Sequence, residues 1–231
     1  MRHLPDLAIV SRRVLTEEGL RPAAILVTGE RIAAIVSRED VPEGCPRRDF
    51  GDRVVMPGLV DAHVHINEPG RTEWEGFHTA TRAAAAGGVT TLVDMPLNSI
   101  PPTTTRAGLL AKRTAAQDRL FVDCGLWGGV VPGNLFELEG LVEDGVCGFK
   151  AFLVDSGVDE FPHVDEDDLR RALPLLADRG IPLLAHAELA LPGSPPTGDA
   201  RAYSTYLEAR PASWENEAIR LLIRLGGDTG A

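Results

Sequence analysis

Residues 57–66 read Pro-Gly-Leu-Val-Asp-Ala-His-Val-His-Ile, and they predict the first strand of a strand-helix repeat. From Leu59 to Ile66 apolar and polar residues alternate, as expected of a β-strand whose successive side chains point to opposite faces. His63 and His65 fall on one face, and the opposite face is apolar. Two imidazoles placed in this way can bind one metal ion. The alternative is a pair of polar residues on a solvated face.

Downstream of this strand the sequence alternates between strand and helix patterns. The expected strands are Val89 to Met95, Leu120 to Trp127, Val146 to Leu153 and Pro182 to Glu188. The expected helices begin at Thr72, Thr104, Asp165 and Ser213. Repeated βα units with buried strands imply a parallel sheet. The residues alone leave open a doubly wound sheet and a (β/α)8 barrel, and no GxGxxG motif supports dinucleotide binding.

Three helix ends carry specific expectations. Thr72 and Glu75 have the spacing of a capping box, and Asp165 is expected to cap a later helix. Gly226 and Gly227 are expected to stop the last helix. The residues of that last helix expected to face inward are Ile219, Leu222 and Ile223.

The count of repeats and the residues before them suggest how the chain is divided. About five βα units are expected, whereas a barrel needs eight, so we expect the chain to stop partway round such a barrel. Before residue 57, the β-branched runs Leu7–Val10, Ala24–Val27 and Arg31–Val36 predict a small antiparallel unit. The expected parts are therefore residues 1–56 and 57–231.

Composition narrows the classes of function. The chain has 34 Asp and Glu against 23 Lys and Arg, a net charge of −11. This charge argues against sequence-independent binding to nucleic acid or to an anionic membrane surface. No apolar run approaches the ~20 residues that cross a bilayer, and the first residues are not those of a signal peptide. Cys45, Cys124 and Cys147 are widely spaced and predict reduced thiols in the cytoplasm.

Two further residues on predicted strands can carry chemistry. Lys150 lies between Phe149 and Ala151 in a strand expected to be buried. Burial of an unpaired ammonium is costly and favours the neutral amine, which can react with carbon dioxide to give a metal-bridging carbamate. The alternative is a strand-end lysine in a salt bridge. His186 by itself is more typical of a core histidine whose hydrogen bonds are satisfied. Its interpretation as a metal ligand is favoured only because it would be a third imidazole beside His63 and His65.

Longer motifs resemble a known family. The stretch from Pro57 to His65 resembles the metal-binding signature of the amidohydrolase superfamily. More specific are NEPGRTEWEGF at 67–77 and AAAGGVTT at 84–91, which runs into DMPLNS at 94–99. Together with GFKAF at 148–152 and HAE at 186–188, these motifs are similar to the allantoinase group of the cyclic amidohydrolases. The resemblance covers nearly the whole chain.

The resemblance implies a fold and a metal site. It implies a (β/α)8 barrel, incomplete over residues 57–231, and the N-terminal part of a small β-sandwich over residues 1–56. His63 and His65 would bind one of two divalent metal ions, with zinc expected. His186 would bind the second ion, and Lys150, carbamylated by carbon dioxide, would bridge both. A further histidine and a general-base aspartate are expected beyond Ala231, so we expect this chain alone to be an inactive N-terminal fragment.

The reaction implied by the resemblance is metal-assisted hydrolysis of a cyclic amide, namely allantoin to allantoate in purine and allantoin degradation. Asn98 is the residue expected to contact the substrate. The resemblance also implies a small-molecule substrate, a cytoplasmic enzyme and a homo-oligomer, a tetramer for the full-length protein. Neither nucleic acid nor a membrane is an expected partner.

Two other enzyme types and one non-enzymatic interpretation stand beside this one. An enzyme of the dihydropyrimidinase or hydantoinase type shares the metal set and acts on related cyclic amides. Dihydroorotase-like proteins have an arginine two residues after the second histidine, where this chain has Asn67. A neutral amide suits an uncharged ring better than a carboxylate. The alternative from another class is a non-catalytic scaffold with the same fold. A scaffold would not need to retain metal ligands, whereas this chain retains His63, His65, Lys150 and His186.

Overall fold

The computed structural model describes residues 4–190, 198–199 and 201–231 of the chain. The chain folds into two compact units, residues 1–58 and residues 59–231. Among the described helices, none is both long and apolar enough to cross a membrane.

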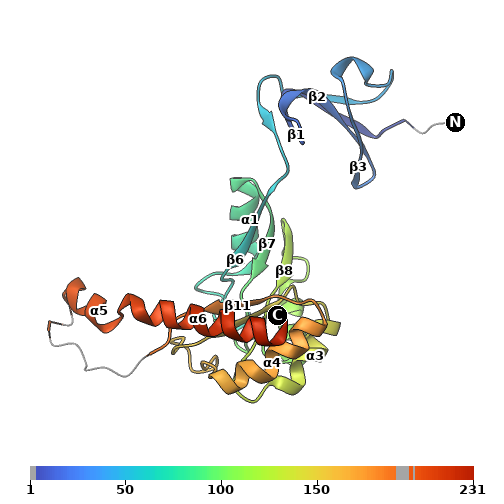
Figure 1. Cartoon of the computed structure of the whole chain (residues 1–231). Coiled ribbons are helices and arrows are strands. Elements are labelled where there is room, and N and C mark those ends of the chain that lie inside the picture. The colour runs from blue at the N-terminus through green and yellow to red at the C-terminus, as the bar shows by residue number, and fades with distance from the viewer. Residues whose placement is uncertain (1–3, 191–197, 200) are drawn as a thin grey trace. The chain divides into compact units, whose positions relative to one another are not determined.

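The first unit is a small β-sheet (Figure 1). Its strands are β1 (Leu7–Thr16), β2 (Gly19–Thr28), β3 (Arg31–Val36), β4 (Arg47–Asp49) and β5 (Val54–Val55), with the 3-10 helix η1 (Arg38–Asp40) after β3. The first three strands pair antiparallel, as the sequence predicts, and β4 and β5 both pair parallel to β1. A small apolar core holds the sheet, and its buried members are Ala8, Val10, Ala24, Leu26, Val41 and Cys45.

The second unit alternates strands and helices. Its elements are β6 (Leu59–Val64), α1 (Phe77–Gly87), β7 (Val89–Asp94), α2 (Arg106–Ala116), β8 (Asp123–Leu126), β9 (Gly128–Gly129), α3 (Leu135–Glu143), β10 (Phe149–Phe152), α4 (Glu166–Asp178), β11 (Leu183–His186), α5 (Tyr203–Ala209) and α6 (Ala212–Thr229). The strands form two parallel sheets, β6-β7-β8 and β9-β10-β11. The Cys147 N–H donates to the Leu126 carbonyl at 2.9 Å and joins them. The predicted parallel α/β architecture is confirmed.

The main core lies between β10 and the helices that cover one face of its sheet. Phe149 and Ala151 of β10 point into this core, where α3, α4 and α6 pack side by side (Figure 1). Fully burying one Leu or Phe side chain contributes about 1.5–3 kcal/mol. The largest fully buried members are Phe149, Leu138, Leu141, Leu169, Leu176 and Leu225. Lys150 and Phe152 alternate with the core residues and therefore face the other side of the strand.

The start of α1 is a correction to the prediction. The helix begins at Phe77 and not at Thr72. The Phe77 N–H donates to Glu68 Oε2 at 2.9 Å, so the capping carboxylate comes from nine residues upstream. Glu75, the predicted partner of Thr72, accepts instead from the Thr79 hydroxyl. A cap contributed by a distant loop residue carries no local spacing signal, and this is why the prediction was wrong.

The last helix also differs from its prediction. α6 continues through Gly226 and Gly227 to Thr229 and is followed by the cap residue Gly230, whose φ of 78° is the left-handed conformation typical of a helix C-terminus. Its buried face consists of Ala218, Leu221 and Leu225. Ile219 and Ile223 are exposed, so the predicted inward face was wrong for these two residues, and Leu222 is only partly buried.

One predicted cap is confirmed, and two helices were not predicted. Asp165 Oδ1 accepts from the Asp168 N–H at 2.8 Å at the start of α4. The helices α3 and α5 were missing from the prediction. α3 contains Gly140, and a Cβ atom at this position would lie 2.5 Å from Cδ of Arg106. Gly140, a residue type that lowers local helix propensity, therefore leaves room for the Arg106 side chain of α2 against α3.

Candidate metal centre

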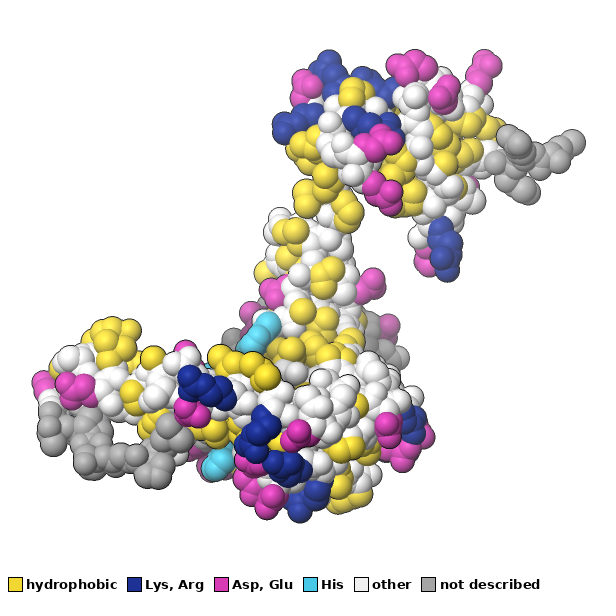
Figure 2. Space-filling model, in the orientation of Figure 1, with side chains coloured by type: hydrophobic (Ala, Val, Ile, Leu, Met, Phe, Trp, Pro, Cys, Tyr) yellow, Lys and Arg dark blue, Asp and Glu magenta, His cyan; other side chains and the backbone are white. Residues whose placement is uncertain are grey.

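His63 and His65 lie at the carboxyl end of β6. Their rings are close, with centroids 5.4 Å apart, and both side chains are exposed. Beyond them Ile66 is buried, but Leu59 and Val60 are exposed because β6 pairs only with β7 among the described strands. The predicted apolar face is therefore covered only at its carboxyl end. Figure 2 shows exposed apolar side chains and imidazole groups on the surface of this unit.

A buried ion pair that the sequence did not predict anchors this end of β6. Asp94, the last residue of β7, accepts from the Ile66 N–H at 2.6 Å and from Lys112 Nζ at 2.6 Å. Lys112 of α2 also donates to the Met95 carbonyl at 2.9 Å. Both charged side chains are completely buried. The pair therefore fixes the backbone directly after His65 to the neighbouring strand and helix.

The electrostatic surroundings of His65 favour a neutral imidazole. The pKa of His65 is lowered, first by loss of solvent around the ring and then by the positive charges of His63, Lys112 and Lys150. A histidine binds a metal ion through an unprotonated ring nitrogen. The cations around His65 therefore favour the form that can act as a ligand.

The chain has two lysines, while its other twenty-one cationic side chains are arginine. Both lysines are buried, but among the residues that the structure describes only Lys112 pairs with a carboxylate. Lys150 is 5% exposed, and its Nζ lies 5.1 Å from the ring centroid of Phe152. Burial alone lowers the pKa of Lys150, and no described carboxylate opposes this shift. Lys150 is thus a buried amine whose pKa is lowered and whose Nζ faces away from the core.

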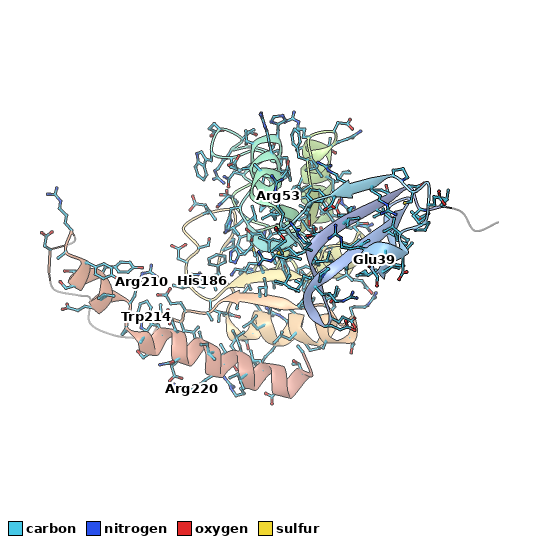
Figure 3. All side chains as sticks on the ribbon, turned by 90° about the horizontal axis from the view of Figure 1, so that it is seen from above. Glu39, Arg53, His186, Arg210, Trp214 and Arg220 are labelled. Carbon is cyan, nitrogen blue, oxygen red and sulfur yellow. The ribbon has the colours of Figure 1, made fainter. Side chains whose placement is uncertain are left out.

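His186 ends β11, directly beside the end of β10. It pairs in register with Phe152, and the two rings stack with centroids 4.9 Å apart. His186 Nε2 lies 3.4 Å from Glu188 Oε2. Arg210 donates to both oxygens of the Glu188 carboxylate, at 2.8 and 2.9 Å. His186 and Arg210 are labelled in Figure 3. A carboxylate on one ring nitrogen leaves the other available as a ligand, and the sequence did not predict Glu188 or Arg210 in this role.

The four predicted ligands form two pairs. His63 and His65 are neighbours on β6, while Lys150 and His186 are joined through the ring of Phe152. Within the described part of the chain, no three His, Cys, Asp or Glu side chains form a cluster that could hold a metal ion. A surface cavity of about 570 Å³ lies between α2 and β8, but none of the four lines it.

Asn98 lies against the histidine pair. It follows β7 in the DMPLNS stretch, and its side-chain nitrogen is 3.4 Å from His65 Nδ1. Its φ of 73° is in the left-handed region, which is uncommon for a residue other than glycine. Asn67, at the position where the dihydroorotase-like alternative has arginine, is buried. Its side-chain oxygen has no hydrogen-bond partner among the described residues.

Comparison with known proteins places these features in a family. A profile described as the amidohydrolase family matches residues 54–196. The allantoinase of Streptomyces avermitilis is 51% identical over 221 residues, which cover 94% of this chain and 49% of that protein. The allantoinase of Saccharomyces cerevisiae is 51% identical over 237 residues, covering 95% of this chain and 51% of that protein. The chain spans about half the length of the curated relatives it matches.

A solved structure shares the fold. The L-hydantoinase (dihydropyrimidinase) of Arthrobacter aurescens superposes with a TM-score of 0.85 and is 32% identical. The match covers 99% of this chain and 52% of that protein.

Proposed function

The chain belongs to the amidohydrolase family, and from this we propose that it supplies part of the metal site of a cyclic amide hydrolase. The proposed substrate is allantoin and the product allantoate. The observation that carries the proposal is Lys150, a buried lysine that no described carboxylate neutralises, near the ends of the strands that carry the histidines. The allantoinases at 51% identity support the choice of substrate.

We further propose that residues 57–231 are the first five βα units of a (β/α)8 barrel. Residues 1–56 would be the N-terminal part of a small β-sandwich. The parallel order of β6 to β8 and of β9 to β11 supports the barrel. In such barrels the catalytic residues gather at the carboxyl ends of the strands. The ends of β6 and β11 and the facing side of β10 carry the four proposed ligands.

The donor set fits two divalent metal ions, with zinc as the proposed metal. His63 and His65 would hold one ion and His186 the other. Neutral Lys150 would add carbon dioxide through Nζ and release one proton, which would give a carbamate, an anionic oxygen ligand that would help to hold both ions. When bound, the ions would make water nucleophilic near neutral pH and polarise the ring carbonyl. Asn98, beside His65, would orient the ring amide.

Hydrolysis of a hydantoin or dihydropyrimidine ring is the second candidate. The superposition on the Arthrobacter aurescens L-hydantoinase at 32% identity favours it. The candidate from another class is a scaffold without catalysis. For the full-length protein we propose a homo-oligomer, a tetramer, in the cytoplasm. The three cysteines, all free in the structure, support that compartment.

Matched chimeras test the proposed function. Residues 1–231 are joined to the complementary half of the Streptomyces avermitilis allantoinase, and in a second protein to that of the Arthrobacter aurescens L-hydantoinase. We expect the first chimera to hydrolyse allantoin, and His63→Ala to abolish this activity. Preference of both chimeras for hydantoin or dihydrouracil would favour the second candidate.

Metal binding provides a readout that does not depend on turnover. Zinc content of the 231-residue chain is measured after dialysis, with His63→Ala and His186→Ala as variants. We expect bound zinc to fall in each variant. Chimeras that neither bind zinc nor hydrolyse any cyclic amide would favour the scaffold.

A further inference from the structure

The peptide unit between Ala62 and His63 lies outside the regular pairing of β6 with β7. The pairing passes from Asp61 directly to Val64, and over the same interval β7 advances by only two residues. β6 thus has one residue more than β7 here, as in a β-bulge, a feature that re-aims side chains and is common next to active sites. Because the pairing skips the backbone that carries His63, other contacts must fix it.

Both polar groups of this peptide unit bond to side chains. The Ala62 carbonyl accepts from Trp127 Nε1 at 2.9 Å. The His63 N–H donates to Asp61 Oδ1 at 3.1 Å. Asp61 is exposed and belongs to the same strand, whereas Trp127 is 7% exposed and follows β8. Since β7 lies between β6 and β8, the indole reaches past one strand to bond the next.

Trp127 is itself firmly held. Its backbone N–H donates to the Asp94 carbonyl at 2.9 Å, which fixes it to the end of β7. A Cβ atom at Gly148 would lie 2.2 Å from Cζ3 of Trp127, so the glycine of the GFKAF motif leaves room for the indole. The ring belongs to an apolar cluster, whose other buried members are Val93, Met95, Leu97 and Phe161. These contacts keep the indole in one orientation and direct its N–H at a fixed point.

The same cluster lies beside the second pair of proposed ligands. Phe161 meets Phe152 edge to face, with ring centroids 5.8 Å apart. Phe152 in turn stacks on His186 and lies near Lys150 Nζ. The packing that holds the indole of Trp127 is therefore continuous with the packing at the other end of the candidate site.

We propose that Trp127 is a positioning residue that acts through the Ala62 carbonyl to set the direction of the His63 side chain. The inference rests on the proposed function, in which His63 is a metal ligand. A ligand binds a metal ion well only when its own orientation is fixed by surrounding packing and hydrogen bonds. The indole has one donor and no acceptor, and a buried N–H without a partner is costly. The indole and the Ala62 carbonyl therefore hold each other in place.

Hydrogen exchange in the metal-free 231-residue chain tests the contact without altering Trp127. The indole N–H groups of the three tryptophans are followed by NMR, and Trp74→Phe and Trp214→Phe assign their resonances. We expect the Trp127 indole N–H to exchange slowly and that of Trp74, which is 60% exposed, to exchange fast. This measurement decides the question of the contact even if Trp127 variants fail to fold.

Trp127→Phe keeps an aromatic ring and removes the donor. We expect the His63 amide to exchange on the order of tenfold faster in this variant. The Asp168 amide, at the start of α4, should keep its wild-type rate, whereas a general loss of stability would affect both amides. The matched control is Val93→Ala, which removes apolar atoms from the same cluster but no hydrogen-bond donor. It should leave the His63 amide unchanged.

Zinc affinity gives a second readout. Loss of a group that orients a metal-bound histidine typically costs about 10–100-fold in affinity. We expect a loss in this range for Trp127→Phe and none for Val93→Ala. Because Trp127 acts through His63, Trp127→Phe should cost little further affinity in a chain that already carries His63→Ala.

Three results would overturn the inference. One is an indole N–H of Trp127 that exchanges as fast as that of Trp74. The second is an equal effect of Trp127→Phe and Val93→Ala on the His63 amide. The third is wild-type zinc affinity in folded Trp127→Phe. A faster His63 amide in a chain whose wild type binds no zinc would support the positioning role of Trp127 and contradict the proposed function, so the two failures are distinguishable.

Discussion

Lys112 Nζ lies 2.6 Å from Asp94 Oδ2, and both side chains are completely buried. The pair links α2 to the end of β7, and Asp94 also accepts the N–H that follows His65. The attraction between the two charges offsets only part of the cost of removing the Asp94 carboxylate from water. The pair therefore fixes the backbone beside the candidate site, and it has no direct role in binding a substrate.

Removal of Lys112 alone should destabilise the chain strongly. Lys112→Met leaves the Asp94 carboxylate buried without its partner, and losses of about 3–5 kcal/mol are typical of such changes. The free energy of unfolding at neutral pH is measured by urea denaturation. The matched control is Glu166→Gln, which removes exposed, solvent-screened pairs of α4 and should lower the free energy of unfolding far less than Lys112→Met does. Equal losses in both variants would contradict the assignment. The double variant Asp94→Asn with Lys112→Met should recover much of the loss.

The same pair predicts a pH dependence. Burial raises the pKa of Asp94 to about 6, although Lys112 opposes the shift. The pKa of an aspartate in an unfolded chain is about 3.9, so the folded state keeps a proton that the unfolded state releases. The stabilising contribution of Asp94 is thus complete below about pH 4 and is lost as the pH rises through about 6.

This dependence is isolated by subtraction. The free energy of unfolding of Asp94→Asn is subtracted from that of the wild type at each pH, so that contributions of other carboxylates cancel. The difference should fall by about 3 kcal/mol between about pH 4 and about pH 7. A difference in the free energy of unfolding that stays constant with pH, or that rises with pH, would contradict this prediction.

Cysteine labelling should distinguish the thiol of Cys124, on β8, from that of Cys147, which lies just before β10. Burial raises the pKa of Cys124 to about 12, whereas Cys147 is exposed. The thiolate is the reactive form, so a maleimide at about pH 8 should modify Cys147 first and Cys124 only slowly. Mass spectrometry of digested protein gives the order. Cys147→Ser should remove the fast phase, and equally rapid labelling of Cys124 in folded protein would contradict this prediction.

The cap of α4 should contribute measurably to stability. Asp165 accepts from the Asp168 N–H at 2.8 Å, and loss of such a cap costs typically about 1 kcal/mol. Asp165→Ala is compared with Asp165→Asn by thermal unfolding, because asparagine retains an accepting oxygen. We expect a lower melting temperature for alanine and a much smaller change for asparagine. Identical melting temperatures for both variants would show that the hydrogen bond contributes nothing.

The sequence was informative where a pattern is local. Alternation over Leu59 to Ile66 predicted both β6 and the neighbouring rings of His63 and His65. Asp165 was predicted as a cap because its partner lies three residues away. In each case the interacting groups are fixed by the geometry of one strand or one turn.

Interactions across long separations were not predictable in the same way. Glu68 caps α1 from another loop, and Asp94 meets Lys112 only after β7 and α2 have packed. The inward face of α6 depends on its contact with α4, and the wrong prediction for Ile219 reflects this. The bond of Trp127 to Ala62 likewise forms only when β6, β7 and β8 pair. Tertiary packing decides each of these contacts.

Detection of a carbamate on Lys150 tests the central claim most directly. The 231-residue chain is incubated with zinc and isotope-labelled bicarbonate, and the carbon resonance of a carbamate is compared between the wild type and Lys150→Met. With two lysines and one N-terminus, few amines can contribute to the spectrum. The account predicts a carbamate signal in the wild type that Lys150→Met lacks. Identical spectra from the two proteins would contradict it.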